Sequence, residues 1–214
     1  MNYKRLYEYR FKSIDQKKRQ IVWNEIAKYV YNQLGRPACI LDPASGRGEF
    51  ISAIPAKERW AVDEIAYYRE GLLNGVIFIE SNILNIDLKN EYFDGIFVSN
   101  FLEHLLNQEQ VVMFLEKMYR ALRKGGRIII LGPNFKYCVS EYFDCADHIL
   151  ALTDISVAEY LYAVGFNIKR VIPRFIPYSF RGILPPSQFL TRWYLRFPFL
   201  WRLLGKQFLL IAER

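Results

Sequence analysis

Short apolar runs that alternate with helical stretches constrain the fold of this chain more than any other feature. Five such runs occur at residues 38–42, 59–63, 76–80, 94–99 and 126–131. The stretches between them predict helices over Glu49–Ile54, Ile65–Leu73 and Gln108–Leu122. Because strands alternate with helices, we expect an α/β fold with a parallel sheet covered on both faces.

The flanking segments complete the predicted layout. Helical spacing of apolar residues predicts a helix over Ile14–Leu34, and a second helix is expected over Ile155–Val164. The runs "FNIKRVI" and "QFLLIA" predict two last strands. We expect one domain with a helical cap at 1–36, a core at 37–132, a substrate segment and helix at 133–165 and the last strands at 166–214. An aromatic and basic insertion at 173–206 separates those strands.

The composition indicates a globular protein of a reducing compartment. The 214 residues are 52% hydrophobic and 24% charged, which excludes a disordered chain. Three cysteines without metal-ligand spacing predict neither a disulfide framework nor a zinc site, so no metal is expected. The N-terminus has no apolar segment of the signal-peptide kind, and we expect a soluble, cytoplasmic protein.

Basic residues gather at the two ends of the chain. Residues 1–36 hold nine basic and three acidic side chains, a balance of +6, and residues 169–214 hold nine and one, a balance of +8. The segment between them, with 11 basic and 18 acidic side chains, has a balance of −7. This asymmetry favours an anionic partner such as a phosphorylated substrate, a lipid surface or a nucleic acid, although basic faces can also be merely solvated.

The stretch "CILDPASGRGEFI", residues 39–51, predicts a cofactor loop, because ligands of open parallel sheets bind beyond the carboxyl ends of strands. The dinucleotide fingerprint G-x-G-x-x-G fails, since its third glycine would fall at Ile51. An acid-x-small-x-G-x-G pattern fits instead, at Asp42, Ala44, Gly46 and Gly48. A second acid, Asp63, ends the next run, where a carboxylate can accept hydrogen bonds from both hydroxyls of a ribose.

Four motifs in this order resemble those of class I S-adenosylmethionine-dependent methyltransferases. They are "LDPASGRG", "AVDE", "FDGIFVSNFLEHL" and "LRKGGRIIILGPN", within residues 38–172. The resemblance implies S-adenosylmethionine as cofactor. It also implies a Rossmann-like, doubly wound sheet of seven strands, mostly parallel with an antiparallel last strand and with helices on both faces. The C-terminal part resembles, more loosely, methyltransferases of bacterial surface-glycan and lipid-linked sugar pathways.

The resemblance implies a role for each matching residue. The Asp42–Gly48 loop would wrap the methionine part of the cofactor, with Asp42 near its ammonium group, and Asp63 would bind the ribose. Asn82 and Ile83 would meet the adenine, where the Asn82 amide oxygen can accept from the amino group. Asn100 would flank the sulfonium. Ala44 departs from the usual glycine, so its methyl group can crowd the cofactor or restrict the backbone.

Two histidines are the candidate catalytic residues. A general base speeds methyl transfer to a hydroxyl by about 10²–10⁴-fold, whereas an amine acceptor needs only to be deprotonated. His104 and His148 both follow predicted strands, and Asp144 or Asp147 can orient the His148 ring. The alternative for His104 is a helix cap or a packing role beside Glu103. The residues expected to line the substrate pocket are Tyr137, Glu141 and Tyr142.

The insertion combines arginines with aromatic side chains. Phe189, Trp193 and Phe197 lie four residues apart, which predicts one stripe of a helix that ends at Pro198. Three interpretations remain open. The stripe can lie on an anionic membrane, roof the site and hold a substrate diphosphate, or pack on the sheet or on a second copy in a homodimer.

The leading hypothesis is a methyltransferase that modifies a hydroxyl or amine of a small molecule, namely a sugar carried on a nucleotide or lipid diphosphate, in glycan biosynthesis. A peripheral contact with the inner face of an anionic membrane is part of this hypothesis. An RNA methyltransferase ranks lower, because "SNFLEHL" lacks the N-P-P-Y-type pocket for a flipped base, so nucleic acid is not an expected partner. The third hypothesis, suggested by Ala44, is a cofactor-binding but inactive partner subunit.

Overall fold

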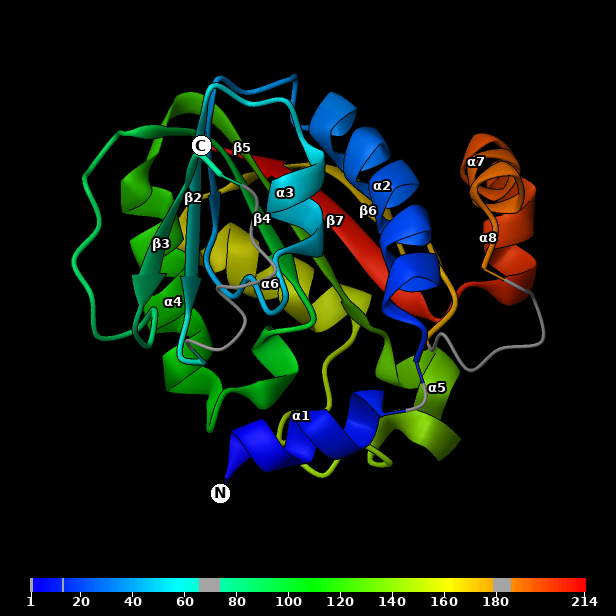
Figure 1. Cartoon of the computed structure of the whole chain (residues 1–214). Helices are drawn as coiled ribbons and strands as arrows, with labels where there is room; N and C mark the ends of the chain where they lie inside the picture. The colour runs from blue at the N-terminus through cyan, green and yellow to red at the C-terminus, as the bar shows by residue number, and fades with distance from the viewer. Residues whose placement is uncertain (1, 13, 66–73, 179–185) are drawn as a thin grey trace.

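A computed structural model describes residues 2–12, 14–65, 74–178 and 186–214 and shows a seven-stranded sheet in the order β3-β2-β1-β4-β5-β7-β6 (Figure 1). Only β7 runs antiparallel to its neighbours, and the paired strands from β3 to β5 are parallel. The predicted fold class is therefore confirmed. The strands are β1 Cys39–Asp42, β2 Glu58–Asp63, β3 Val76–Glu80, β4 Phe93–Ser99, β5 Leu122–Pro133, β6 Asn167–Ile172 and β7 Gln207–Glu213.

Helices cover both faces of the sheet, and each face has its own apolar core. On one face α4 and α6 pack on the strands around Phe114, Leu161 and Phe208. On the other face α2 and α3 pack around Trp23, Phe50 and Phe97. The helices are α1 Tyr3–Phe11, α2 Gln16–Gln33, α3 Glu49–Ala53, α4 Gln108–Ala121, α5 Phe135–Tyr142, α6 Asp154–Val164, α7 Gln188–Arg196 and α8 Pro198–Leu204.

Local capping explains why several predicted helices begin where they do. The Asp15 carboxylate accepts from two backbone N–H groups of the first turn of α2, and Asn107 caps α4 in the same way. Thr153 and Ser156 form a reciprocal capping box at α6, which Gly165 ends in the left-handed conformation. These polar contacts satisfy backbone groups that a helix end would otherwise leave unpaired.

Three segments differ from the prediction or fall outside it. The helix expected at Ile65–Leu73 lies almost wholly outside the described residues. The segment after β5, expected as a polar stretch, forms α5. Pro198 does end α7, but it also begins α8, because proline suits the first turn of a helix, where its missing N–H is not needed.

The insertion attaches to α2 and to the sheet through a few residues. Trp201 is 4% exposed, and its indole N–H donates to the Tyr194 carbonyl at 2.8 Å. The Trp201 ring also lies 5.0 Å from that of Phe175, between ring centroids. On α2, the buried Glu25 carboxylate accepts from the Arg192 guanidinium at 3.0 and 3.1 Å. These contacts hold α7 and α8 beside α2 (Figure 1).

The Glu25–Arg192 pair makes stability depend on pH in acid. The hydrogen bonds from Arg192, which outweigh burial, lower the pKa of Glu25 from 4.5 to about 2. A carboxyl with a depressed pKa stabilises the folded protein above pH 4.5 and loses that contribution as the pH falls toward 2. We expect Glu25→Gln to lower the free energy of unfolding at pH 7, because it removes this carboxylate. The expected loss is only about 1–2 kcal/mol, since Arg192 is exposed to solvent, which screens the pair.

Urea denaturation at pH 7 and at pH 3 checks this expectation. The difference in free energy of unfolding between the natural protein and Glu25→Gln should shrink at the lower pH. Glu116, which forms an exposed ion pair with Arg120, is the control, and Glu116→Gln should change the free energy of unfolding little at either pH. An equal difference at both pH values would contradict the assigned pKa.

Candidate active site

The candidate site lies where β1, β2 and β4 end side by side. Asp42 is the last residue of β1 and Asp63 the last of β2, and Asn100 follows β4 directly. Since β1 lies between β2 and β4 in the sheet, the topology brings these three polar residues to one edge. The structure therefore gathers residues that the sequence predicted for one cofactor site.

The loop after β1 turns sharply because two glycines adopt the left-handed conformation. The φ angle is +52° at Gly46 and +74° at Gly48, values that other residues rarely adopt. A Cβ at Gly46 would meet no atom within 4 Å, so the backbone angle rather than crowding calls for glycine there. Ala44 lies outside this region of φ, and its methyl group therefore does not strain the backbone.

Asp63 holds the glycine loop against β2. One carboxylate oxygen accepts from the Gly46 N–H at 2.8 Å, and the other accepts from the Ile65 N–H at 3.0 Å. Burial raises the pKa of Asp63, and these two hydrogen bonds oppose that rise. Each carboxylate oxygen keeps further lone pairs, so the group can also accept from a ligand hydroxyl.

The carboxyl group of Asp42 is buried and has one unpaired oxygen among the described residues. Its side chain is 3% exposed, and within the described part of the chain its Oδ1 has no hydrogen-bond partner. Burial and then the charge of Asp63 raise its pKa well above the ordinary value. An unpaired buried acceptor costs free energy, and an ammonium group of a ligand would remove that cost.

Asn82 and Ile83 begin the turn that follows β3. The Asn82 side-chain oxygen accepts from the Leu84 N–H at 2.7 Å, which occupies one of its two lone pairs. The Ile83 side chain is buried in the core, and its carbonyl accepts from Lys117 at 2.9 Å. The lone pair and amide N–H groups that Asn82 retains can serve a ligand such as adenine.

Asn100 has a φ of +49°, a conformation that asparagine tolerates better than most residues. Its N–H donates to the Leu131 carbonyl at 2.8 Å, and its side-chain amide donates to the Ser99 hydroxyl at 2.9 Å. Backbone strain of this kind is often found where a site needs a set direction. Here it turns the chain from β4 into the short 3₁₀ helix Leu102–His104.

The contacts of His104 define the role of each of its ring nitrogens. Its Nδ1 lies 3.0 Å from the Asp147 carbonyl oxygen, which can only accept, so Nδ1 carries the proton of the neutral ring. Nε2 then keeps its lone pair, 4.0 Å from the nearer carboxylate oxygen of Glu103. The cap of α4 is Asn107, so the alternative that His104 caps this helix is wrong.

His148 lies against His104, with 4.9 Å between the ring centroids. Burial, together with the neighbouring His104, lowers the pKa of His148 to about 4, so the ring is neutral at physiological pH. Asp144 is exposed, and the Asp147 carboxylate accepts from Arg10. Neither carboxyl group therefore orients the His148 ring as the sequence suggested. That ring instead contacts Tyr142, at 4.8 Å between centroids.

The three residues predicted for the substrate pocket occupy different environments. Tyr142 is fully buried, and its hydroxyl donates to the Leu150 carbonyl at 2.6 Å, so it supports the His148 loop and does not line an open pocket. Tyr137 is 39% exposed and packs under Arg174, and Glu141 forms an ion pair with Lys206. Substrate contact by Tyr137 and Glu141 stays a prediction.

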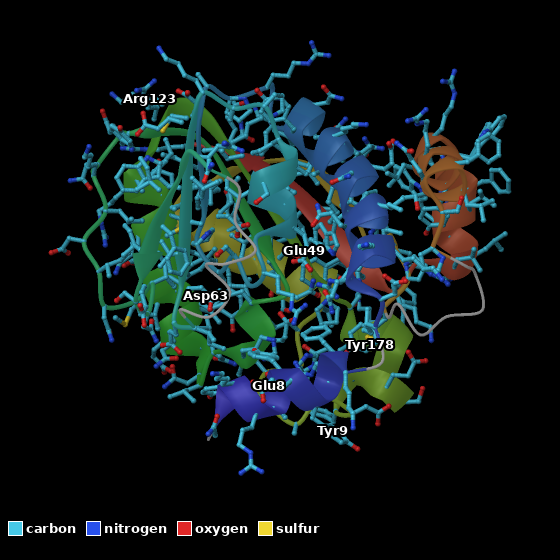
Figure 2. All side chains as sticks on the ribbon, in the orientation of Figure 1. Glu8, Tyr9, Glu49, Asp63, Arg123 and Tyr178 are labelled. Atoms are coloured by element: carbon cyan, nitrogen blue, oxygen red, sulfur yellow. The ribbon has the colours of Figure 1, made fainter. Side chains whose placement is uncertain are left out.

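Helix α1 lies across the carboxyl end of the sheet, and Figure 2 shows its Glu8 and Tyr9 below Asp63. Arg10 of this helix forms an ion pair with Asp147, the residue that also bonds His104. Burial opposes the charge of Asp147, but the hydrogen bond from Arg10 lowers the pKa of Asp147. Sequence reasoning missed Arg10, because nothing local indicates a partner 137 residues away.

Comparisons with known proteins agree with this geometry. Residues 41–130 match a family model described as a methyltransferase domain. This match assigns a methyltransferase domain to that part of the chain. No curated protein sequence matches.

Solved structures of low sequence identity share the fold of this methyltransferase domain. A SAM-dependent methyltransferase from Archaeoglobus fulgidus is 22% identical, with 100% of both chains covered and a TM-score of 0.69. A possible histamine N-methyltransferase from Thermotoga maritima is 16% identical, with 98% of both chains covered and a TM-score of 0.65. A 1,6-didemethyltoxoflavin N1-methyltransferase from Burkholderia thailandensis, solved with S-adenosylhomocysteine, is 18% identical. The alignment covers 99% of this chain and 88% of that enzyme's chain, with a TM-score of 0.61.

The cofactor is S-adenosylmethionine, and the residues at the strand ends fit it. The unpaired buried oxygen of Asp42 would accept from the ammonium group, and the lone pairs of Asp63 would accept from the ribose. When bound, the cofactor supplies a sulfonium methyl group.

Proposed function

We propose that this methyltransferase acts on a hydroxyl or amine of a small molecule, and that His104 is the residue that meets the acceptor. The observation that carries this proposal is the lone pair of His104 Nε2, defined by the bond from Nδ1 to the Asp147 carbonyl. His104 is four residues from Asn100, at the same strand end. His148 lies beside it and is neutral, so it can bond the acceptor as well.

The reaction with a hydroxyl is a displacement at the methyl carbon. The acceptor oxygen attacks the methyl group, the bond from that carbon to sulfur breaks, and the hydroxyl proton passes to His104 Nε2. The products are the methyl ether and the neutral thioether S-adenosylhomocysteine. Holding the two reactants in line can lower the barrier by about 7–11 kcal/mol, and a general base adds about 10²–10⁴-fold.

The acceptor we propose is a sugar carried on a nucleotide or lipid diphosphate. The support is the excess of basic residues in the C-terminal segment, nine against one acidic between 169 and 214. Several of these arginines are exposed on α7 and α8. One arginine guanidinium can donate two parallel hydrogen bonds to two oxygens of a phosphate, so such a surface suits a diphosphate-bearing substrate.

A methylation screen with labelled S-adenosylmethionine tests this function. The panel should hold nucleotide sugars, lipid-linked sugars, matching sugars without the diphosphate, and small amines. Transfer to the diphosphate-linked sugars alone would support the proposal. Transfer to RNA, or cofactor binding without transfer to any acceptor, would favour the RNA methyltransferase or the inactive partner instead.

We also propose that α7 and α8 contact an anionic membrane. Their outward side chains Phe189, Trp193, Phe199 and Leu203 are 47–66% exposed, although Trp201 and Leu195 of the same helices are buried. Arg196 and Arg202 are exposed beside these aromatic groups. Apolar rings with flanking arginines are the composition of an interfacial helix, and none of the described helices is long and apolar enough to cross a bilayer.

Co-sedimentation with vesicles measures this contact. The protein should bind vesicles rich in anionic lipid and not neutral vesicles, and salt should weaken the binding. Arg196→Glu with Arg202→Glu should weaken it at least thirtyfold, because each basic residue contributes about 1 kcal/mol. Lys17→Glu with Lys124→Glu makes the same change of net charge elsewhere on the surface and serves as the control.

Equal loss of vesicle binding in both double variants would show that only net charge matters and would contradict a specific surface. Trp193→Ala adds a second check. Since this side chain is 47% exposed, its removal should change the free energy of unfolding by about 0.5 kcal/mol or less while it weakens vesicle binding.

A further inference from the structure

Three side chains beside the cofactor crevice form a group with the composition of a metal site. Glu103, His104 and His148 each offer one ligand atom, and these atoms lie within 4.8 Å of one another. None of these ligands is a cysteine, so the cysteine spacing that predicted no metal does not bear on this group. Two imidazoles with one carboxylate form the ligand set of many catalytic sites that keep open coordination positions.

Two atoms of this group are buried without a partner. Glu103 is 2% exposed, and within the described residues its Oε1 accepts no hydrogen bond. The Nδ1 atom of His148 is also buried, and it has no hydrogen-bond partner among the described residues. Leaving a buried carboxylate oxygen and an imidazole nitrogen unsatisfied is costly, and a cation between them would satisfy both.

His104 already has the support that a metal-binding histidine needs. Its Nδ1–H donates to the Asp147 carbonyl, which directs the lone pair of Nε2 toward Glu103. Ligand histidines usually donate their second nitrogen to a carbonyl or carboxylate, which sets the tautomer and the ring orientation. The Arg10–Asp147 ion pair holds this supporting residue in place.

The backbone holds the three ligands in one unit. The Glu103 carbonyl accepts from the Ile149 N–H at 2.8 Å and from the Leu150 N–H at 3.1 Å. These bonds join the 3₁₀ helix that carries Glu103 and His104 to the loop that carries His148. The arrangement therefore does not depend on long flexible side chains that reach across a surface.

We propose that Glu103, His104 and His148 bind one divalent first-row transition-metal ion. Imidazole nitrogen favours Zn²⁺, Co²⁺ or Fe²⁺ over Mg²⁺ and Ca²⁺, which take oxygen ligands. Binding would draw the three atoms to the roughly 2.0–2.2 Å bonds of such ions. This departs from the expectation, based on the cysteines, that the protein has no metal.

The ion has a consequence for the acceptor, and this second half of the inference rests on the proposed function. An acceptor hydroxyl in an open coordination position would lose its proton to water more readily, because the ion stabilises the oxygen anion. The oxygen anion would then attack the methyl group. In the metal-bound protein water would take the proton, and His104, the base proposed above for the ion-free protein, would serve as a ligand instead. An amine acceptor gains nothing from this arrangement, so the ion favours a hydroxyl acceptor.

Binding is tested directly on the full chain, without an activity assay. After dialysis against EDTA and removal of the chelator, the protein is titrated with Zn²⁺ by calorimetry and with Co²⁺ by visible absorption. We expect one ion per chain, and a Kd at least tenfold weaker in Glu103→Gln and in His148→Gln. Glu109→Gln, an exposed glutamate six residues further along, is the matched control and should bind as the natural protein does.

Thermal unfolding gives a second measurement. At a hundredfold excess over Kd, the ion should raise the Tm of the natural protein by roughly 5 °C or more. Without metal, Glu103→Gln should be at least as stable as the natural protein, because it removes an unpaired buried carboxyl group. Should Glu103→Gln fail to fold, the half-buried His148 variant still tests the site.

Lack of binding, or equal affinity in the two ligand variants and the control, would overturn the proposed site. Full transfer to a hydroxyl acceptor in the presence of EDTA would overturn the second half, even where calorimetry shows the ion. Failure of the proposed function is separate, since it would appear as absent methyl transfer at any metal concentration, with ion binding unchanged.

Discussion

His104→Gln is expected to lower kcat by about 10²–10⁴-fold, the contribution of a general acid–base group in a proton-transfer step. The glutamine amide can still donate to the Asp147 carbonyl that now accepts from Nδ1, so the loop should keep its shape. What the variant loses is the imidazole lone pair of Nε2. A ligand role for this nitrogen predicts a loss as well, and the metal titrations distinguish the two roles.

Steady-state kinetics and cofactor calorimetry check this result together. Affinity for S-adenosylmethionine should stay within about twofold, since a loss confined to kcat points to an interaction made in the transition state. Glu109→Gln serves as the control for general effects on this part of the chain. An unchanged kcat in a folded His104→Gln protein would remove this residue from the mechanism.

Asp63→Ala is expected to weaken S-adenosylmethionine binding by about 1.5–3 kcal/mol, or roughly 10–150-fold. The carboxylate has two tasks in the structure. We propose that it accepts from the ribose, and it accepts from the Gly46 N–H at 2.8 Å, which holds the glycine loop. Alanine removes both acceptors at once.

Calorimetry with S-adenosylmethionine and with S-adenosylhomocysteine measures this loss. The loss should be similar for the two, because the proposed contact of Asp63 is with the ribose and not with the methyl group. Asp87→Ala changes an exposed carboxylate in the turn after β3 and is the matched control. Cofactor affinity that stays the same in a folded Asp63→Ala protein would contradict the assignment of this residue.

Much of the cofactor half of the site could be predicted from the sequence. Strands 76–80 and 94–99 were expected near the bounds that the structure shows, because short β-branched runs between turn signals are local information. The glycine loop and Asp63 were expected to meet for the same reason, since parallel strands end at one edge of a sheet. The Gly46–Asp63 hydrogen bond joins the two elements.

The acceptor half depends on contacts between distant segments. Sequence reasoning expected Asp144 or Asp147 to orient His148, but the folded loop turns the Asp147 carbonyl to His104, 43 residues earlier. Tyr142 was expected to line a pocket and is instead fully buried. A side chain's direction in an irregular segment is decided by what packs against it, and periodicity does not carry that information.

The sequence by itself therefore determined the order of the strands and of most helices along the chain, the glycine loop proposed for the cofactor and the residue types available for catalysis. These depend on local patterns of apolar side chains, glycines and caps. Only the tertiary structure decided which histidine Asp147 supports, that Arg10 of α1 forms an ion pair with Asp147, and that an unpaired oxygen of Glu103 lies near two imidazoles. Those outcomes depend on long-range packing and burial, which change the partners and protonation of a polar group without changing the local pattern.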